Sequence, residues 1–315
     1  MDGLINIPLV YRKIIFILAV CLCLSPLIDP PLALLLGIII AQTITHPFSS
    51  YNSKATKYLL QFSIVGLGFG MNLFKAMEAG REGLFFTIGT IVGVLIAGYL
   101  IGRWLKIDKV TSYLISGGTA ICGGSAIAAI SPLVKADEKQ ISVALGTIFI
   151  LNSVALFIFP MIGNVLHLSQ LQFGFWAAIA IHDTSSVVGA ASKYGKLALE
   201  TATTIKLERA LWIIPLAIFT AFVFKSKGQK IKIPWFILYF VIAMTISTFF
   251  KPVQDFAPVI VFIAKKGFTL TLFLIGAGLS RKNLKTVGIK PFMEGIMLWV
   301  IISVTSLLVI LQTVR

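Results

Sequence analysis

The residues best suited to chemistry lie in one short glycine-rich run. It reads GGTAICGGSA from Gly117 to Ala126 and holds two Gly-Gly pairs six residues apart. Each Gly destabilises a helix by roughly 1 kcal/mol relative to Ala, so four of them this close together predict a broken helix. A break frees backbone amides and carbonyls, which must then meet protein, water or a ligand. The free amides at the start of a half-helix suit an anion.

We expect the backbone and hydroxyl groups of this run to bind substrate. Close helix packing through small residues is the alternative explanation. Packing accounts easily for one Gly pair and poorly for two, so we favour a binding site. Its predicted members are Gly117, Gly118, Thr119, Cys122, Gly123, Gly124 and Ser125.

A second polar run, HDTSS, lies in the middle of another apolar segment. An ionisable residue at that depth in a membrane is a functional candidate. Histidine titrates near neutral pH and burial favours a protonated carboxyl, so either His182 or Asp183 can carry a coupling ion. The hydroxyls of Thr184, Ser185 and Ser186 can bind an oxyanion or sodium. A buried His–Asp pair that only locks helix packing is the structural alternative.

Three charged residues, Lys206, Glu208 and Arg209, form a third cluster. Lys206 and Arg209 are three positions apart and share a helix face. We place them near the outer end of their span. There they either attract an anion or reach toward lipid headgroups with Glu208 as partner, and the sequence does not decide between the two. Pro215, later in the same segment, predicts a kink.

The segments that carry these residues are too apolar for a soluble protein. Of 315 residues, 57% are hydrophobic and 12% are charged, whereas soluble domains have about 25% charged residues. Because a membrane-spanning helix needs about 20 apolar residues, the chain contains roughly eleven candidate spans. The predicted spans are 13–28, 31–46, 57–76, 84–102, 112–133, 141–162, 172–192, 204–224, 233–250, 257–279 and 291–312. This pattern predicts an all-α polytopic protein, in which the segments 112–133 and 172–192 either cross the membrane fully or are re-entrant.

The net charge of +15 comes from basic residues that lie mostly between apolar runs. Their distribution favours a cytoplasmic N-terminus in the cell inner membrane and contact with anionic lipid. The basic residues form no nucleic-acid-binding motif, and Cys21, Cys23 and Cys122 form no disulfide or metal framework. We expect no cofactor and no metal. Glu294 lies near a helix start, where the helix dipole favours a carboxylate. Asn152 is more typical of a helix–helix contact than of a ligand.

Two weak internal similarities suggest repeats. CGGSAIAAI, from Cys122 to Ile130, matches HDTSSVVGA, from His182 to Ala190. A second pair aligns Gly68, Gly70 and Gly80 with Gly276, Gly278 and Gly288. If all eleven segments cross the membrane fully, the two stretches of the first pair run in the same direction. The helices of the second pair then run in opposite directions, as in many transporters.

The two polar motifs together carry a family resemblance. GGTAICGGSAIAAISPLVKA at 117–136 and AIHDTSSVVGAAS at 180–192 resemble the sulfate-exporter family of YeiH-like bacterial membrane proteins. The resemblance covers essentially the whole chain, and both motifs are specific to that family. The family is similar to the bile-acid–sodium symporter and sodium–proton antiporter folds. It implies inverted repeats of five helices, a panel domain, and a core domain with two broken helices that cross.

Carried onto this sequence, the resemblance implies one transmembrane domain over residues 1–315. An extra N-terminal helix lies within 1–30, and the repeats occupy 31–165 and 170–315. Gly123 and Gly124 lie at the break of the fifth span. Gly276 and Gly278 lie at the break of its counterpart, the tenth span, and join the predicted substrate site.

These patterns favour a secondary active transporter of a small anion: sulfate, sulfite, a sulfonate or a carboxylate. It would work by ion-coupled alternating access of elevator type, with a proton or sodium as the coupling ion. The main alternative is a sodium–proton antiporter that uses Asp183. A hydrolase using Ser185 or Ser186 with His182 and Asp183 is disfavoured, because neighbours on one helix project in different directions. We therefore expect no enzyme. No span shows the long polar stripe of a channel, and a homodimer is left open.

Overall fold

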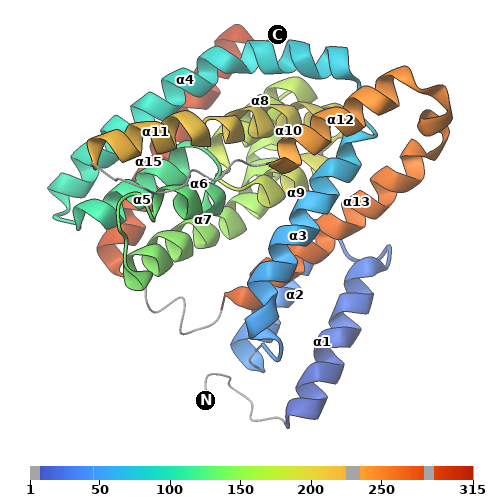
Figure 1. The fold of residues 1–315 in the computed structure, drawn as a ribbon, viewed down its shortest axis with the longest axis horizontal. Coiled ribbons are helices and arrows are strands. Elements are labelled where there is room, and N and C mark those ends of the chain that lie inside the picture. Colours follow the sequence, from blue (N-terminus) through green and yellow to red (C-terminus); the bar gives the residue numbers. More distant parts are fainter. Residues whose placement is uncertain (1–7, 45, 225–234, 280–286, 315) are drawn as a thin grey trace. The chain divides into compact units, whose positions relative to one another are not determined.

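The regular structure of the chain is helical. The computed structural model describes residues 8–44, 46–224, 235–279 and 287–314, and every regular element within those ranges is an α-helix, as predicted. The chain divides into two compact units, one of Met1–Ala76 with Trp235–Leu284 and one of Met77–Pro234 with Lys285–Arg315 (Figure 1). Each unit takes helices from both halves of the sequence, so the units cut across the predicted repeats of 31–165 and 170–315.

Several helices are long enough for a bilayer. Within the described ranges, four have the length and apolar composition to cross a membrane, and two shorter helices are also apolar. The four are Phe86–Trp104, Glu138–Val165, Lys251–Gly278 and Ile289–Thr313, and the shorter two are Pro30–Thr43 and Trp235–Phe249. These helices agree with a membrane protein, while the number of eleven spans stays a prediction.

The first unit is built around a close pair of helices. α2 (Pro30–Thr43) packs along α13 (Lys251–Gly278). Glycines make this approach possible, because a Cβ at Gly37 would overlap the Phe273 carbonyl oxygen and a Cβ at Gly276 would overlap that of Leu34. The other helices described in this unit are α1 (Leu9–Leu24), α3 (Ser49–Gly68) and α12 (Trp235–Phe249).

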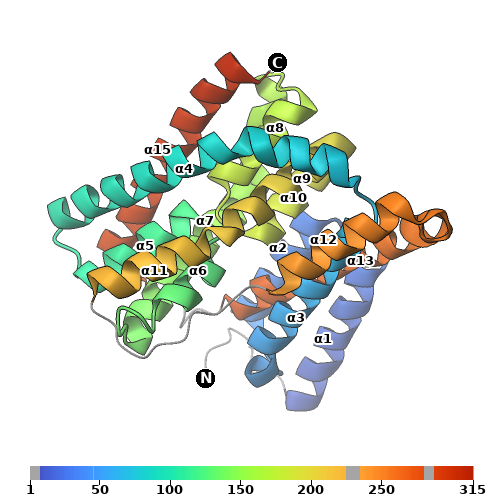
Figure 2. The same cartoon turned by 45° about the horizontal axis from the view of Figure 1, so that its top comes forward.

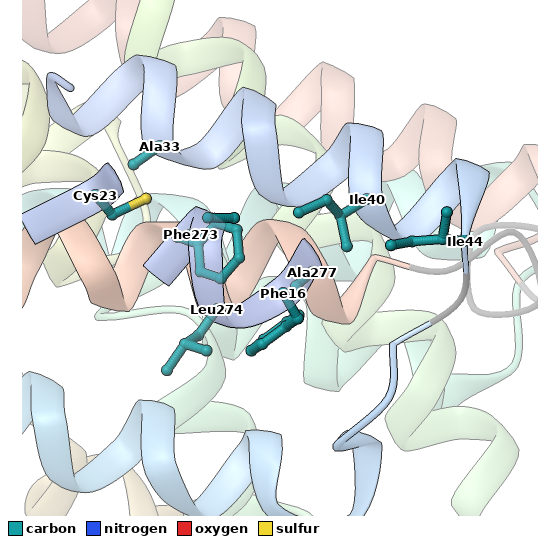
Figure 3. Close-up of a cluster of buried hydrophobic side chains, with 9 residues drawn as sticks. Phe16, Cys23, Ala33, Ile40, Ile44, Phe273, Leu274 and Ala277 are labelled. Atoms are coloured by element: carbon teal, nitrogen blue, oxygen red, sulfur yellow. The ribbon is translucent and has the colours of Figure 1, made fainter. Parts of the chain in front are cut away.

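An apolar cluster joins three helices of this unit. α1 contributes Phe16 and Cys23, and α13 contributes Phe273 and Ala277 (Figure 3). Ile40 of α2 completes the contact.

Side chains from α2 and α3 bind the carbonyls at the end of α13: Gln42 Nε2 donates to Leu279 O at 2.7 Å and Asn52 Nδ2 to Leu274 O at 2.9 Å.

The helix α13 corrects one implication of the resemblance. It continues without a break through Gly276 and ends at Gly278. Gly276 serves a helix–helix contact in the first unit, whereas the broken helix at Gly123 belongs to the second. A second interrupted segment lies in the same unit as the first: the segment predicted as 172–192, which is interrupted between Ala180 and Thr184.

The second unit contains both interrupted helices. The first consists of α5 (Lys109–Ala120) and α6 (Gly124–Ile130), and the second of α8 (Gln170–Ala180) and α9 (Thr184–Tyr194). The other helices described in the unit are α7 (Glu138–Val165), α10 (Lys196–Leu211), α11 (Ile213–Val223), α15 (Ile289–Thr313) and most of α4 (Leu73–Trp104). The interruption between α10 and α11 falls at Trp212, just before Pro215, as the sequence predicts.

The first interrupted helix folds back on itself. A Cβ at Gly118 would contact Ile127, and one at Gly117 would contact Ile130, so α6 returns alongside α5. The open end of this hairpin lies at the start of α7. There Gln140 Nε2 of α7 donates to the carboxylate of Asp108, the N-cap residue of α5, at 2.8 Å. The predicted span 112–133 is therefore a helical hairpin.

The second interrupted helix also folds back. Phe173 near the start of α8 stacks on Tyr194 at the end of α9, with ring centroids 3.8 Å apart. The Gln170 side chain accepts from Leu197 N at 3.0 Å, which joins the starts of α8 and α10. Tyr194 Oη donates to Leu168 O, just beyond the end of α7, at 2.7 Å. The predicted span 172–192 is likewise a hairpin.

The two hairpins open at opposite ends of α7. The open end of the first is bonded to the start of α7, and that of the second lies just beyond its end. Consequently α6 and α9, the returning legs, run in opposite directions. The prediction that the matching stretches Cys122–Ile130 and His182–Ala190 run the same way is wrong, because it counted each hairpin as a full crossing.

Candidate functional site

The tips of the two hairpins meet beside the middle of α7. The tip of the first hairpin is residues 121–123, and the tip of the second is 181–183. A Cβ at Gly123 would lie 2.8 Å from the carbonyl oxygen of His182 and 3.0 Å from Ile148 Cγ2 on α7. Asn152 Oδ1, one turn further along α7, accepts a hydrogen bond from the His182 backbone N–H at 3.0 Å.

Glycine is required at the first tip for two reasons. Gly123 has φ +63° and ψ −120°, a conformation that residues with a Cβ rarely adopt. Its backbone N–H donates to Gly118 O at 2.8 Å, which closes the end of α5, and its carbonyl accepts from Ile127 N to begin α6. The second Gly pair therefore marks the turn between the two legs of the hairpin.

The side chain of Lys206 joins the two tips. Its Nζ donates to Ile121 O at 3.0 Å on the first tip, and to Ile181 O at 2.7 Å and Ala178 O at 3.2 Å on the second hairpin. The side chain is 0% exposed. Three donated bonds match the three N–H groups of a charged ammonium. Lys206 therefore brings a positive charge to the carbonyl ends of both α5 and α8.

Arg209 adds a second buried cation. Its guanidinium donates to Ala120 O at 2.5 Å and to Thr90 Oγ1 on α4 at 2.7 Å, and its side chain is also 0% exposed. Both sequence interpretations of Lys206 and Arg209, as an external anion attractor or as headgroup anchors, are thus wrong. Glu208, on the same helix, accepts from Thr87 Oγ1 at 3.2 Å.

Asp183 caps the returning leg of the second hairpin. Its carboxylate accepts from the backbone N–H groups of Ser185 and Ser186 at 3.3 and 2.9 Å, and from their hydroxyls at 2.6 and 2.7 Å. A carboxylate at a helix N-terminus is stabilised by the free amides and the helix dipole. Two of the three hydroxyls predicted to bind a ligand, those of Ser185 and Ser186, are therefore directed at Asp183.

Several buried polar atoms at the tips have no hydrogen-bond partner among the described residues. They are both ring nitrogens of His182, Nδ2 of Asn152 and Oγ1 of Thr119 in the last turn of α5. All three side chains are at most 3% exposed. An unpartnered buried polar group is destabilising and needs an explanation, such as a water or a ligand. These atoms include several hydrogen-bond donors.

The other predicted site residues have varied positions. Cys122 is buried at the first tip, Gly124 packs near the Phe149 ring, and Ser125 is exposed. Thr184 is buried in the first turn of α9. Gly117 and Gly118 provide room between the hairpin legs, as the packing alternative proposed. Gly276 and Gly278 belong to the first unit, and their part in substrate binding stays a prediction.

A further buried carboxylate lies away from the tips. Glu294 of α15 is 0% exposed and accepts from Ser112 Oγ at 2.5 Å near the start of α5. Its Oε2 has no partner among the described residues. α15 also passes beside α8 (Figure 2), where Trp176 Nε1 donates to Ser303 O at 2.9 Å. In the described part of the chain, no group of three or more His, Cys, Asp or Glu side chains is arranged to hold a metal.

The sequence that contains these residues matches a known protein family. Residues 9–295 match the family model described as conserved hypothetical protein 698. The chain belongs to this family. The matched range includes both hairpins, Lys206 and Arg209.

Relatives in the family are known as membrane proteins. The chain is 58% identical to a UPF0324 membrane protein of Bacteroides thetaiotaomicron over 285 residues, covering 90% of this chain and 86% of the relative. It is 52% identical to one of Porphyromonas gingivalis over 291 residues, covering 90% and 87%. It is 49% identical to one of Vibrio vulnificus over 303 residues, covering 95% and 97%. No solved structure matches the chain.

Proposed function

We propose that this membrane protein is a secondary active transporter of a small anion. The observation that carries the proposal is the meeting of two helical hairpins at a buried point with two cationic side chains and unpartnered donors. α7 has 28 residues, which corresponds to about 42 Å at 1.5 Å per residue and exceeds the ~30 Å hydrocarbon core. Both tips contact its middle, so in a membrane they would lie near the midplane, where transporters bind their substrates.

The groups at the tips favour an anion. Lys206 and Arg209 are positive, and Asp183 is a carboxylate already held by four hydrogen bonds. The free donors of Thr119, Asn152 and His182 can each bind an oxygen of a sulfate, sulfite, sulfonate or carboxylate. In a low-dielectric interior, charge-assisted hydrogen bonds of this kind are strong.

The arrangement of the hairpins supports an inverted repeat. The same number of residues separates the ends of α5 and α8, at Ala120 and Ala180, as separates the starts of α6 and α9, at Gly124 and Thr184. Each hairpin is followed by a longer helical segment, α7 in one case and α10 with α11 in the other. We propose that this hairpin–helix pair is the repeated element, in place of the five-helix repeat. The two compact units support an alternating-access cycle in which one unit moves as a body.

The test is ligand-dependent stabilisation of the purified protein in detergent. A ligand that binds only the folded state raises its melting temperature by mass action. We expect sulfate, sulfite, a small sulfonate or a carboxylate to raise that temperature in wild type. Thr119→Val should abolish the rise without loss of basal stability, because the hydroxyl it removes has no partner among the described residues.

Thr271→Val is the matched control. Thr271 is equally buried, lies in the first unit, and donates to Gly267 O at 2.8 Å. This variant should keep the full anion response. If no anion stabilises the wild type, or if Thr119→Val responds as the control does, the anion site at the tips is wrong. Stabilisation by sodium alone would instead support the sodium–proton antiporter, with Asp183→Asn as the variant that should then lose sodium-dependent proton flux.

A further inference from the structure

The three carbonyl oxygens around Lys206 are arranged as the ligands of a cation site could be. Ile121 O lies just past the end of α5, and Ala178 O and Ile181 O lie at the end of α8. Carbonyls at the C-terminal ends of helices carry partial negative charge. In transporters with interrupted helices, such carbonyls coordinate the coupling cation. Here they surround Lys206 Nζ at 2.7 to 3.2 Å.

We propose that Lys206 is a tethered replacement for a free monovalent cation at this carbonyl cage. Its ammonium occupies the position that potassium or ammonium would take if the side chain were removed. The charged groups that interact with it are Arg209 on the same helix and Asp183 on the second tip. Because the tether supplies the cation permanently, the junction of the two tips needs no sodium from solution.

This inference rests on the proposed function for its consequence, which concerns the coupling ion. A transporter with a filled cage would move its anion without sodium, and any coupling would use a proton or an exchanged anion. Lys206 is a positioning residue in this scheme, since it holds the two tips together and does not itself have to touch the substrate. A structural clamp with no relation to a cation site would show no preference among salts after the side chain is lost.

Two substitutions separate these explanations. Lys206→Ala removes both the charge and the side-chain volume, so the three carbonyls face an empty space that a small cation can enter. Lys206→Met removes the charge but keeps an unbranched side chain of similar length, so that space stays filled. Both variants are melted in detergent in ammonium, potassium, sodium and choline chloride at equal ionic strength. Choline is too large for the cage and serves as the inert cation.

The expected result is selective recovery. Lys206→Ala should melt several degrees higher in ammonium or potassium chloride than in choline chloride, while Lys206→Met should melt at one temperature in all four salts. The same melting temperature of Lys206→Ala in all four salts would overturn the proposal. The proposal would also be overturned if Lys206→Ala folded in none of the four salts, because ammonium supplies the cationic group that was lost.

The wild type provides an independent test that needs no variant. Its melting temperature, and its anion uptake into vesicles, should be unchanged when sodium is replaced by choline. Sodium-dependent uptake by the wild type would refute the tethered-cation proposal and leave the anion transporter intact. The reverse outcome is also possible. If ammonium raises the melting temperature of Lys206→Ala while no anion stabilises the wild type, the carbonyl cage is supported and the proposed substrate class is refuted.

Discussion

Substitution of Gly123 by Ala should destabilise the protein strongly through the tip of the first hairpin. The added methyl group would meet the His182 carbonyl oxygen at 2.8 Å and Ile148 Cγ2 at 3.0 Å. The carbonyl belongs to backbone that His182 and Asn152 hold in place through a 3.0 Å hydrogen bond, so it cannot move aside cheaply.

The size of the effect follows from two terms. A non-glycine residue in a sparsely populated backbone conformation costs about 1–3 kcal/mol. Overpacking a filled interior costs about another 1–3 kcal/mol. The free energy of unfolding should therefore fall by roughly 2–6 kcal/mol if the tip keeps its conformation. If the two hairpins separate instead, the same variant should also lose anion-dependent stabilisation.

Gly89→Ala is the control for this variant. Gly89 lies inside α4, and apart from its chain neighbours and its own helix backbone no atom of the described residues lies within 4 Å of an added Cβ, so Ala should stabilise by about 0.5–1 kcal/mol. Both variants can be unfolded with denaturant while the fluorescence of the five tryptophans is followed. If Gly123→Ala proves as stable as Gly89→Ala, the left-handed tip and its contact with His182 are wrong.

Substitutions at three further residues, Asn152, Asp183 and Gly37, test other contacts in the same assay. Asn152→Leu should lose about 1–3 kcal/mol of stability, because it leaves the His182 N–H buried without a partner; an unchanged midpoint would contradict that bond. Asp183→Ala should lose about 0.5–2 kcal/mol with the cap of α9, and Asp183→Asn should lose less. Equal loss in both would show that capping is not the role of Asp183. Gly37→Ala should lose at least about 1–3 kcal/mol by forcing α2 away from α13, whereas Gly93→Ala, with open space around its Cβ, should lose none.

The break in the first hairpin was predictable because it depends on a local property. Four glycines within eight positions destabilise a helix wherever it is placed, and the chain turns at the second pair. The polar run at His182 was predictable for a similar reason, since ionisable residues inside apolar segments are rare. Both stretches named from the sequence do meet in the folded chain.

The sequence analysis misplaces Lys206 and Arg209 because the helix that carries them begins with a partly polar stretch. α10 starts at Lys196, whereas the predicted span starts at 204, so residues well inside the helix are assigned to its outer end. Their partners at Ala120, Ile121 and Ile181 are backbone carbonyls, and any residue can supply a carbonyl. The Lys–Arg pair and Asn152 were visible only as polar residues within apolar runs.

The role of Gly276 depended on tertiary contact in the same way. A glycine in a helix can mark a break or a close approach of another helix, and the sequence alone does not distinguish the two. In α13 the helix is continuous and the missing side chain admits the backbone of α2. The break that the resemblance implied at Gly276 is therefore absent.

The sequence by itself determined that the protein is helical, that it belongs in a membrane, and that two polar interruptions occur among its apolar segments. Those properties follow from composition and local propensity, which act over one or two helical turns. Only the tertiary structure decided that each interruption is a fold-back, that the two tips meet at α7, and that Lys206 links them. These contacts join residues far apart in the chain through backbone atoms, whose positions depend on the packing of whole helices and not on the identity of any one side chain.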